Sequence, residues 1–590
     1  MRIGARVTSL WRRTSGWSPG AMVLLAAGVG VLGGFGAVGF RWLLRYLRDH
    51  LWPVQEFGVD AVAALDWYWV VGIPAAAGLV VGSITRWFAP ETRGHGVPEV
   101  MEAVALRGGA IRPRVVVAKA IASGVCIASG GSAGREGPIV QIGAGIGSTV
   151  GGILHVGARR MRTLVGCGAA AGISATFNAP VAGALFAVEI LLGDFAVHQF
   201  SPIVISSVMA TIVSRHYLQD VPAFEIPAEQ LATYRLVHPA ELLAYAVLGI
   251  LAGFLAFTFI RALSFSEDRF ERSRLPSPLR AALGGGIVGL IALVFPHVLG
   301  VGYETITNAL VGSPSALLLA GLIVAKLLAT CVTLGSGGSG GVFAPSLFLG
   351  AMLGGLVGIG VHALFPGLTA VPNAYALVGM GAVVAAAARA PITTILIVFE
   401  LTSDYRIMLP LMVSCIVATL FAQRLGKESI YTEKLARRGV RVGAGHDVNL
   451  LRNIPVRDVL RNKPHMVAPS AHLASIVRRL SSNEAMTLYV VGPGDRLQGV
   501  ISMRELRPVL NDIDTLDDLV VATDVAASDT PSVSIDESLD LVLARLDFGY
   551  RDELPVVDGD RLLGVVRVED VLARYRRELA RRELAEGLGE

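Results

Sequence analysis

Charged residues are scarce in this sequence, and the patterns of metal-dependent enzymes are missing from it. Only 17% of its residues are charged and 53% are hydrophobic, which is not the composition of a typical soluble enzyme. The formal net charge of +4 over 590 residues is small, so nucleic acid is not expected as a partner. No HExxH pair occurs among the 11 histidines, which argues against an intramembrane metalloprotease.

The cysteines give no sign of disulfide or metal chemistry. No two of the 4 have CxxC spacing, and each lies inside an apolar stretch: Cys126, Cys167, Cys331 and Cys415. We interpret them as small hydrophobic residues of helices. No pairing of a nucleophile with a base and no metal-ligand spacing occurs either, so we predict neither an enzyme nor a metal site.

Long apolar runs are present instead. The first, from about residue 21 to 39, is long enough to span a bilayer. No small-residue cleavage site is evident after it, so we predict a retained helix rather than a signal peptide. Four arginines precede the run, and by the positive-inside rule they place the N-terminus in the cytoplasm: Arg2, Arg6, Arg12 and Arg13. We therefore predict an integral protein of the cell membrane with cytoplasmic N- and C-termini.

The membrane part contains an internal repeat. Residues 117–138, VAKAIASGVCIASGGSAGREGP, match residues 324–345, VAKLLATCVTLGSGGSGGVFAP, at 11 of 22 positions, without a gap and at an offset of 207. Residues 164–189 also match residues 377–400 after a two-residue deletion. The chain is therefore predicted to contain two related halves.

Each repeat copy is an apolar stretch that stops at a glycine-rich break and then restarts. Backbone without hydrogen-bond partners is too costly to face lipid, so such a break must be buried in protein or line a wet cavity. Matching breaks in two halves indicate a transport site at the interface of the repeats. Three breaks end in proline: Gly94-His95-Gly96-Val97-Pro98, Gly134-Arg135-Glu136-Gly137-Pro138 and Gly341-Val342-Phe343-Ala344-Pro345.

The chemistry expected at these breaks is weak anion binding. A helix that starts inside the membrane presents free N–H groups and the positive end of its dipole. Several such starts together form an anion site without a full positive charge. An ion held this weakly can also leave, which conduction requires.

Glu136 is the acidic exception within these breaks. When ionised, its carboxylate can occupy an anion position itself, and when protonated it can swing away, so we predict that Glu136 is a gate. The alternative is a simple ion pair with Arg135 or a lysine, which is less favoured because adjacent helix residues do not face each other. Two further carboxylates, Glu189 and Glu400, occupy equivalent places in apolar surroundings. For both we favour a structural polar contact over a functional role.

The composition changes at about residues 427–449, beyond which charge rises. Two copies of a pattern of helix, strand, Gly-Asp turn, strand and helix follow, with strands predicted at 488–491, 498–501, 554–557 and 563–566. This cytosolic region, about 454–575, resembles a pair of CBS domains.

The motifs GHGVPEV, GREGP and GGVFAP, in this order and with the tandem tail, resemble the CLC family of chloride channels and proton-coupled chloride antiporters. The resemblance implies an all-α polytopic membrane protein whose two halves have inverted topology, followed by a cytosolic α/β CBS pair. It also implies a homodimer with one anion pathway per subunit, in which chloride, lipid and, for antiporters, protons are the partners. The expected domains are a transmembrane domain at 1–445, with halves at about 21–215 and 240–435, CBS domains at 446–512 and 513–577, and a tail at 578–590.

The resemblance implies roles for individual residues as well. Glu136 matches the external gating glutamate, Phe343 belongs to the segment whose backbone amides hold the anion, and Tyr431 matches a tyrosine that lines the central site. The other anion-binding residues are expected in the three breaks: Gly94, His95, Gly96, Val97, Pro98, Gly134, Arg135, Gly137, Pro138, Gly341, Val342 and Ala344.

Two positions depart from the best-studied antiporters. His95 stands where those proteins have serine, a residue associated with chloride, whereas proline there is associated with nitrate; the anion preference stays open. Ile190 stands where they have the internal proton glutamate, and an aliphatic side chain passes no proton. We therefore favour a voltage- or pH-gated chloride channel. The alternatives are a proton-coupled antiporter with another proton route, a fluoride or nitrate transporter of the same fold, and a CBS-regulated cation channel outside the family.

CBS pairs often bind adenine nucleotides through a hydroxyl three residues after a strand-end glycine and a carboxylate six residues after it. The first copy offers Ser502 and Glu505 at these places, and the second offers Arg567 and Asp570. Asp570 can accept ribose hydroxyls and Arg567 can meet phosphate. A purely structural or dimerising pair is the equal alternative, and transport itself is expected to require no cofactor.

Overall fold

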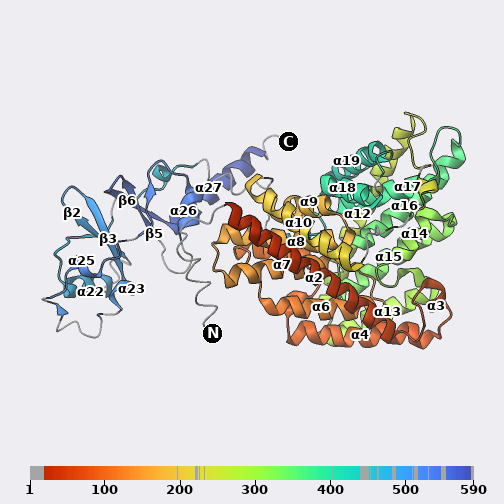
Figure 1. The fold of residues 1–590 in the computed structure, drawn as a ribbon, viewed down its shortest axis with the longest axis horizontal. Coiled ribbons are helices and arrows are strands. Elements are labelled where there is room, and N and C mark those ends of the chain that lie inside the picture. The colour runs from red at the N-terminus through yellow and green to blue at the C-terminus, as the bar shows by residue number, and fades with distance from the viewer. Residues whose placement is uncertain are drawn as a thin grey trace. The chain divides into compact units, whose positions relative to one another are not determined.

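The chain folds into two compact units in a computed structural model, Met1–Val442 and Gly443–Glu590 (Figure 1). The structure describes residues 19–193, 195, 197–218, 224, 226–231, 233–402, 404–438, 451, 454–461, 464–481, 487–507, 509, 516–517, 519–528, 530–546 and 553–586. The four N-terminal arginines and the last residues of the predicted tail lie outside them: Arg2, Arg6, Arg12, Arg13 and 587–590.

The first unit is helical in both of its halves. The first half contains α2 (Pro19–Leu51), α3 (Val59–Ala63), α4 (Trp67–Trp87), α5 (Val97–Leu106), α6 (Pro113–Ala128), α7 (Glu136–Ile153), α8 (Ala158–Phe177), α9 (Pro180–Phe186), a π-helix (Ala187–Leu192) and α10 (Val197–Leu218). After the short α11 (Ala228–Leu231), the second half contains α12 (Glu241–Glu271), α13 (Ser277–Val294), α14 (Tyr303–Val311), α15 (Ala316–Gly335), α16 (Phe343–Leu364), α17 (Pro372–Ala388), α18 (Pro391–Thr402), α19 (Met408–Leu425) and α20 (Thr432–Arg437).

Several of these helices have the length and composition of membrane spans. Among the described residues, 7 qualify: α2, α4, α12, α13, α15, α16 and α19. Large apolar side chains such as Leu243 and Leu317 are exposed on them, as expected where a helix faces lipid rather than water. The first unit is thus the membrane-spanning part that the apolar runs predicted.

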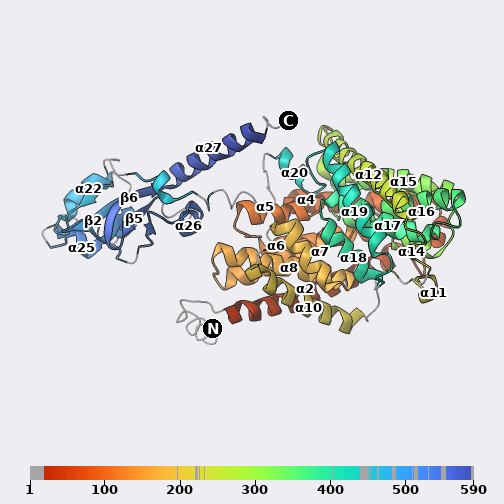
Figure 2. The same cartoon turned by 90° about the horizontal axis from the view of Figure 1, so that it is seen from above.

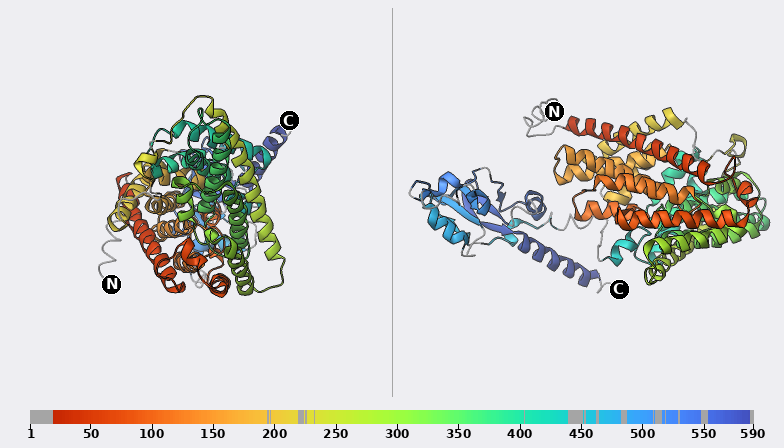
Figure 3. Two further views of the ribbon diagram at one scale, coloured as in Figure 1. Left: turned by 90° about the vertical axis from the view of Figure 1, so that its right-hand side faces the viewer. Right: turned by 90° about the horizontal axis from the view of Figure 1, so that it is seen from below.

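The helices of the two halves form two neighbouring groups. In the first half, α2, α7, α8 and α10 pack together, and in the second α12 packs against α15, α17 and α19 (Figures 1 and 2). Figure 3 shows the helices of this unit from the side and from below. The crossings of α7 with α8 and of α16 with α17 occur at glycines. A β-carbon placed on Gly143 would lie 2.0 Å from the carbonyl oxygen of Gly168, and one placed on Gly350 would lie 2.3 Å from that of Gly379.

Reciprocal contacts show that the halves are related by a pseudo-two-fold axis. Ser123 contacts Ser339 at 2.9 Å, and the repeat equivalents of these residues, Thr330 and Ser132, contact each other at 3.0 Å. Near this axis the two breaks pair antiparallel through Gly134 and Gly341. A two-fold operation through an antiparallel pair reverses the chain direction, as the inverted halves implied by the resemblance require.

The second unit is built on one six-stranded sheet with the order β1-β2-β3-β6-β5-β4. The strands are β1 (Met466–Val467), β2 (Thr487–Gly492), β3 (Arg496–Ser502), β4 (Val533–Ser534), β5 (Glu553–Asp558) and β6 (Arg561–Arg567). The helices are α22 (Leu473–Ser481), α23 (Met503–Leu506), α25 (Ala522–Val525), α26 (Leu539–Arg545) and α27 (Val568–Glu586). The two predicted hairpins are β2–β3 and β5–β6, and they meet where Arg496 pairs with Arg561.

Candidate functional site

The three helix breaks predicted from the sequence lie together in the first unit. Gly134 and Gly341 exchange two backbone hydrogen bonds, of 2.8 and 2.6 Å. Gly94 donates to the carbonyl of Gly338 at 3.1 Å and accepts from the amide of Gly340 at 3.3 Å. The starts of α5, α7 and α16 therefore converge on one place, although the segments are far apart in the chain.

A fourth break completes the set, and the sequence analysis did not find it. Gly300 and Gly302 precede α14 with φ values of +60° and +86°, and Gly94 and Gly96 precede α5 with φ values of +82° and +87°. Positive φ is a conformation that favours glycine, so the same turn is built in both halves. The signal available was the repeated Gly-x-Gly, but α14 starts at Tyr303 and lacks the proline that marked the other three breaks.

Two buried lysines hold these turns in place. Lys119 donates to the carbonyls of Thr92 and Gly94 at 2.9 and 2.8 Å, and Lys326 donates to those of Val298 and Gly300 at 2.9 and 3.0 Å. The lysines are repeat equivalents and are both fully buried. They satisfy carbonyls that the break has freed, which is the requirement for irregular backbone at membrane depth.

Glu136 lies at the centre of this arrangement. Its carboxylate is buried, with 1% of the residue exposed, and Oε1 accepts a hydrogen bond of 2.7 Å from the hydroxyl of Tyr303. Among the described residues, Oε2 has no hydrogen-bond partner. A β-carbon placed on Gly134 would lie 2.1 Å from Oε2 and 3.2 Å from the amide nitrogen of Ala344. The carboxylate thus lies beside the start of α16.

Arg135 is adjacent to Glu136 but is directed elsewhere. Its guanidinium carbon lies 4.9 Å from the centroid of the Tyr303 ring. Within the described part of the chain, no ion pair joins Arg135 to Glu136. The geometry therefore offers no support for the alternative in which Glu136 only pairs with its neighbour.

The residues expected to bind the anion occupy different surroundings. Phe343 is the first residue of α16, and its ring lies 5.5 Å from that of Phe177. Tyr431 is 2% exposed and directly precedes α20. The remaining residues of the three breaks lie at or just before the starts of α5, α7 and α16: Gly94, Gly96, Val97, Pro98, Gly134, Gly137, Pro138, Gly341, Val342 and Ala344.

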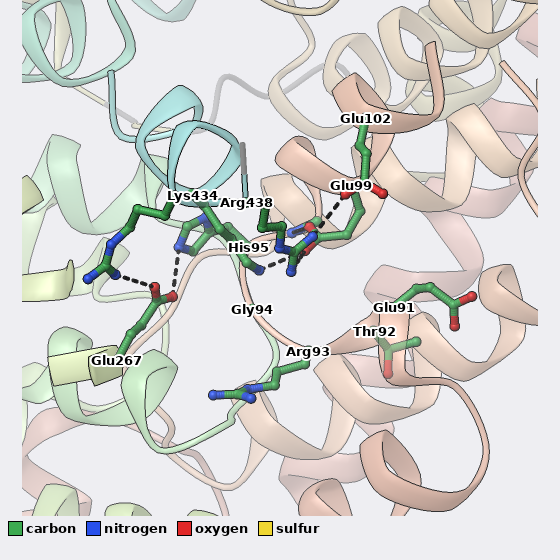
Figure 4. A network of polar contacts seen from close by, with 12 residues as sticks. Glu91, Thr92, Arg93, Gly94, His95, Glu99, Glu102, Glu267, Lys434 and Arg438 are labelled. Carbon is green, nitrogen blue, oxygen red and sulfur yellow. Dashed lines mark hydrogen bonds and ion pairs between the residues drawn. The ribbon is translucent and has the colours of Figure 1, made fainter. Parts of the chain in front are cut away.

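His95 faces a carboxylate that the sequence analysis did not identify (Figure 4). The residue is 2% exposed, and its Nε2 lies 3.7 Å from Oε1 of Glu267 on α12. Neither ring nitrogen makes a hydrogen bond within the described part of the chain. Glu267 is more than 170 positions away and carries no motif, so only the fold brings it to the first break.

Charged side chains of α5 and α20 surround this break (Figure 4). Glu99 accepts from the backbone N–H of Gly96 at 3.1 Å and from Lys434 at 2.6 Å. Arg438 donates to Glu102 at 2.9 Å. The start of α5 is thus fixed both by its own glutamate and by the helix that follows Tyr431.

Glu189 and Glu400 are reciprocal helix caps. Glu189 accepts from the backbone N–H and hydroxyl of Thr393, at 2.7 and 2.5 Å, at the start of α18. Glu400 accepts from the backbone N–H groups of Val181 and Ala182, at 3.0 and 2.7 Å, at the start of α9. Each carboxylate satisfies free donors of the helix from the other half. Ile190, next to Glu189 in the π-helix, is 8% exposed and belongs to the apolar core.

In the second unit, each candidate nucleotide-binding residue already has a partner. The hydroxyl of Ser502 donates to Glu505 at 2.5 Å. Arg567 donates to Glu553 at 2.8 Å, and Asp570 pairs with Arg461 at 2.7 Å. The hydrogen bond that Arg461 donates to Asp570 raises the pKa of the Arg461 guanidinium. No cluster of three or more potential metal ligands occurs among the described residues.

Comparison with known proteins identifies both parts of the chain. The family model described as "Voltage gated chloride channel" matches residues 77–423, and the CBS domain model matches residues 456–512 and 521–577. A putative chloride channel protein, ClcB-like, of Ralstonia nicotianae is 38% identical over 420 residues, which are 70% of this chain and 97% of that protein. The H(+)/Cl(-) exchange transporter ClcA of Klebsiella pneumoniae (strain 342) is 34% identical over 452 residues, covering 74% and 92%.

Solved structures of chloride-transporting and CLC proteins also resemble this chain. The crystal structure of a slow cyanobacterial Cl⁻/H⁺ antiporter matches with a TM-score of 0.63 at 29% identity, over 71% of this chain and 97% of that one. A eukaryotic CLC transporter matches with a TM-score of 0.65 over 93% of this chain and 97% of that one, and at 21% identity it supports the fold alone.

Proposed function

The chain belongs to the family of voltage-gated chloride channels, the CLC family, and we propose that it transports chloride across the cell membrane through a pathway gated by Glu136. The observation that carries the proposal is the buried carboxylate of Glu136 beside the converging starts of α5, α7 and α16. An anion that passes these helix starts meets free N–H groups and positive dipole ends. The ionised carboxylate competes with it for the same place.

The anion site itself is assigned to the backbone of the breaks. Gly341, Val342, Phe343 and Ala344 supply amides at the start of α16, and the hydroxyl of Tyr431 supplies a neutral donor. His95 contributes through its backbone, because its Nε2 faces Glu267. Chloride is favoured over nitrate and fluoride by the names of the relatives, and family membership argues against a cation channel of another class.

We favour conduction without proton coupling. Ile190, an apolar residue of the core, stands where the antiporters of this family have a proton-carrying glutamate. The second candidate is proton-coupled exchange, because the relatives include proteins named as H(+)/Cl(-) exchange transporters. Such an exchanger needs a proton route other than Ile190. In either case we expect a homodimer with one pathway per subunit and cytoplasmic N- and C-termini.

The test is made on the purified full chain in chloride-loaded liposomes, with external chloride and external pH recorded together while a potassium ionophore sets the voltage. We expect chloride efflux without uphill proton movement. Proton uptake driven by the chloride gradient would establish exchange instead. Absence of chloride efflux from well-folded protein would overturn the assignment to chloride transport.

Glu136→Gln tests the gate in the same liposomes. The amide imitates the protonated side chain, so we expect chloride efflux that no longer varies with pH. Glu304→Gln is the control, since Glu304 is an exposed carboxylate at the start of α14 and its loss should leave the pH profile unchanged. A Glu136→Gln variant that keeps the parent's pH profile would remove Glu136 from the gating role.

A further inference from the structure

Tyr303 places a phenol directly against the proposed gate. We propose that Tyr303 is a positioning residue that holds the ionised carboxylate of Glu136 in its closed place and so sets the pH at which the pathway opens. The inference rests on the proposed gating role of Glu136. It comes from the fourth break, which brings the start of α14 to the other three and aims the Tyr303 hydroxyl at Oε1 of Glu136 at 2.7 Å.

The Tyr303 ring is held from two sides. The guanidinium of Arg135 lies 4.9 Å from its centroid, within the range of a cation–π contact. The ring of Phe224 lies 5.2 Å away at an interplanar angle of 71°, an edge-on contact. A ring fixed in this way presents its hydroxyl to Glu136 with little rotational freedom to lose. The hydrogen bond is therefore built into the site rather than formed by a mobile side chain.

The backbone of Tyr303 is fixed as well. Gly302 has a φ of +86°, and a β-carbon placed on it would lie 2.8 Å from the ring of Phe348 on α16. The turn before α14 therefore packs directly on the helix whose start adjoins Glu136. Lys326 holds the same turn through the carbonyls of Val298 and Gly300.

Glu136 has few other partners that could take over this role. Oε2 has no hydrogen bond within the described part of the chain, and Tyr303 is the one side chain there that donates to the carboxylate. The charged and titratable groups nearby are Arg135 on α7, which stacks on Tyr303, Arg41 on α2, which lies near Arg135, Lys326 on α15, which is occupied by carbonyls, and Tyr431 before α20. The start of α16 brings the backbone amide of Ala344 beside the carboxylate.

The sign of the effect follows from the charge of the acceptor. A hydrogen bond to an ionised group is stronger than one to a neutral group, so the phenol favours the ionised, closed carboxylate over the protonated one. Removing the hydroxyl should make protonation easier. The pathway should then open at a higher pH than in the parent, by about one pH unit if the difference between the two hydrogen bonds is typical.

Tyr303→Phe removes one oxygen atom and keeps the ring between Arg135 and Phe224. In the chloride-efflux assay we expect its half-maximal pH to rise by about one unit. Efflux by Glu136→Gln and by the Glu136→Gln/Tyr303→Phe double variant should be equal and independent of pH. Tyr375→Phe is the matched control, because Tyr375 is a buried tyrosine that donates to another glutamate, Glu241, at 2.9 Å. It should leave the half-maximal pH unchanged.

Incorporating 3-fluorotyrosine at position 303 keeps the side chain nearly unchanged and makes the phenol a stronger donor. It should move the half-maximal pH downwards, and it serves if Tyr303→Phe does not fold. Unchanged profiles for both variants, with pH dependence still lost in Glu136→Gln, would overturn the role of Tyr303 and leave the gate intact. A change in efflux caused by Tyr303→Phe in the Glu136→Gln background would also overturn it, because the effect would then not act through the carboxylate.

Discussion

At the residue scale, the carboxylate of Glu136 occupies the space that a side chain at position 134 would fill. Gly134 has no β-carbon, and that space is taken by Oε2 of Glu136. The backbone of Gly134 is meanwhile held by two hydrogen bonds to Gly341. The position of the carboxylate is therefore defined by an absent side chain on one segment and by the start of α16 on the other.

Gly134→Ala should open the gate by steric displacement. The added methyl group would lie 2.1 Å from Oε2, and the flexible carboxylate is the group that can move, since the backbone of Gly134 is paired with Gly341. We expect chloride efflux at high pH, where the parent is closed, to rise toward the level of Glu136→Gln. Efflux by a Gly134→Ala/Glu136→Gln variant should equal that of Glu136→Gln. If Gly134→Ala passes as little chloride as the parent at high pH, this placement of the carboxylate is contradicted.

Sequence analysis identified some residues of this site and missed others for a physical reason. Glu136 is an acidic residue inside a break, and its position relative to the helix start is fixed by neighbours in the chain. A structural polar contact was predicted for Glu189 and Glu400, and the structure shows these contacts as helix caps of α18 and α9. Tyr303 and Glu267 reach the breaks only because α14 and α12 fold back onto them, and nothing local marks either residue.

At the element scale, glycine allows helices of the same half to cross in backbone contact. A β-carbon on Gly143 of α7 would lie 2.0 Å from the carbonyl oxygen of Gly168, and one on Gly168 would lie 1.9 Å from that of Gly143. Small residues at such crossings are the usual means of close packing in lipid, where no hydrophobic force drives helices together. The equivalent crossing of α16 and α17 repeats the arrangement with Gly350 and Gly379.

Gly143→Ala should therefore destabilise the membrane unit. The new methyl group meets a carbonyl oxygen that can yield only by separating α7 from α8, at a cost of about 1–3 kcal/mol. Gly152→Ala is the matched control in the same helix, because no atom lies within 4 Å of its β-carbon, and the better helix propensity of alanine should make it neutral or stabilising by up to about 1 kcal/mol. The measurement is the apparent Tm of each variant in detergent, taken as the temperature at which half of the monodisperse peak in size-exclusion chromatography is lost. Equal Tm values for the two variants would show that the crossing relaxes freely.

The elements themselves were predictable to different degrees. The three breaks that end in proline were located from the sequence. The break before α14 was missed, because α14 starts without proline and a Gly-x-Gly pattern by itself is too short a signal. In the second unit both hairpins were predicted from short β-rich runs on either side of a Gly-Asp turn. The parallel strands β1 and β4 were not, because each has two residues and gains its pairing only from the adjacent hairpin.

At the scale of the whole molecule, one chain joins the membrane-spanning unit to a second unit that is built on a six-stranded sheet. The second unit matches the CBS domain model twice. Arg567 of the second copy and Arg461 of the first copy are cations held by carboxylates of the second copy, Glu553 and Asp570. An incoming phosphate would compete for the same guanidinium groups with a geometry that suits them, and release of Asp570 from Arg461 would make its oxygens available to ribose hydroxyls.

We therefore propose that the full chain binds ATP or AMP at this unit, and that the exchange of partners by Arg461 is what binding requires. Calorimetric titration of the purified full chain should give heat at millimolar nucleotide, and Asp570→Asn should weaken binding about tenfold through loss of a charged acceptor. Asp560→Asn is the control, since Asp560 is an exposed carboxylate of the β5–β6 turn, 67% exposed and paired only with Arg496 in the described region.

Arg461→Met tests whether Arg461 binds phosphate, because this variant leaves Asp570 free for ribose but removes one phosphate donor. If the substitution weakens the binding of ATP more than it weakens the binding of AMP, Arg461 is assigned to phosphate. If neither nucleotide gives a binding heat with a full chain whose chloride efflux is intact, the CBS pair has a structural or dimerising role only.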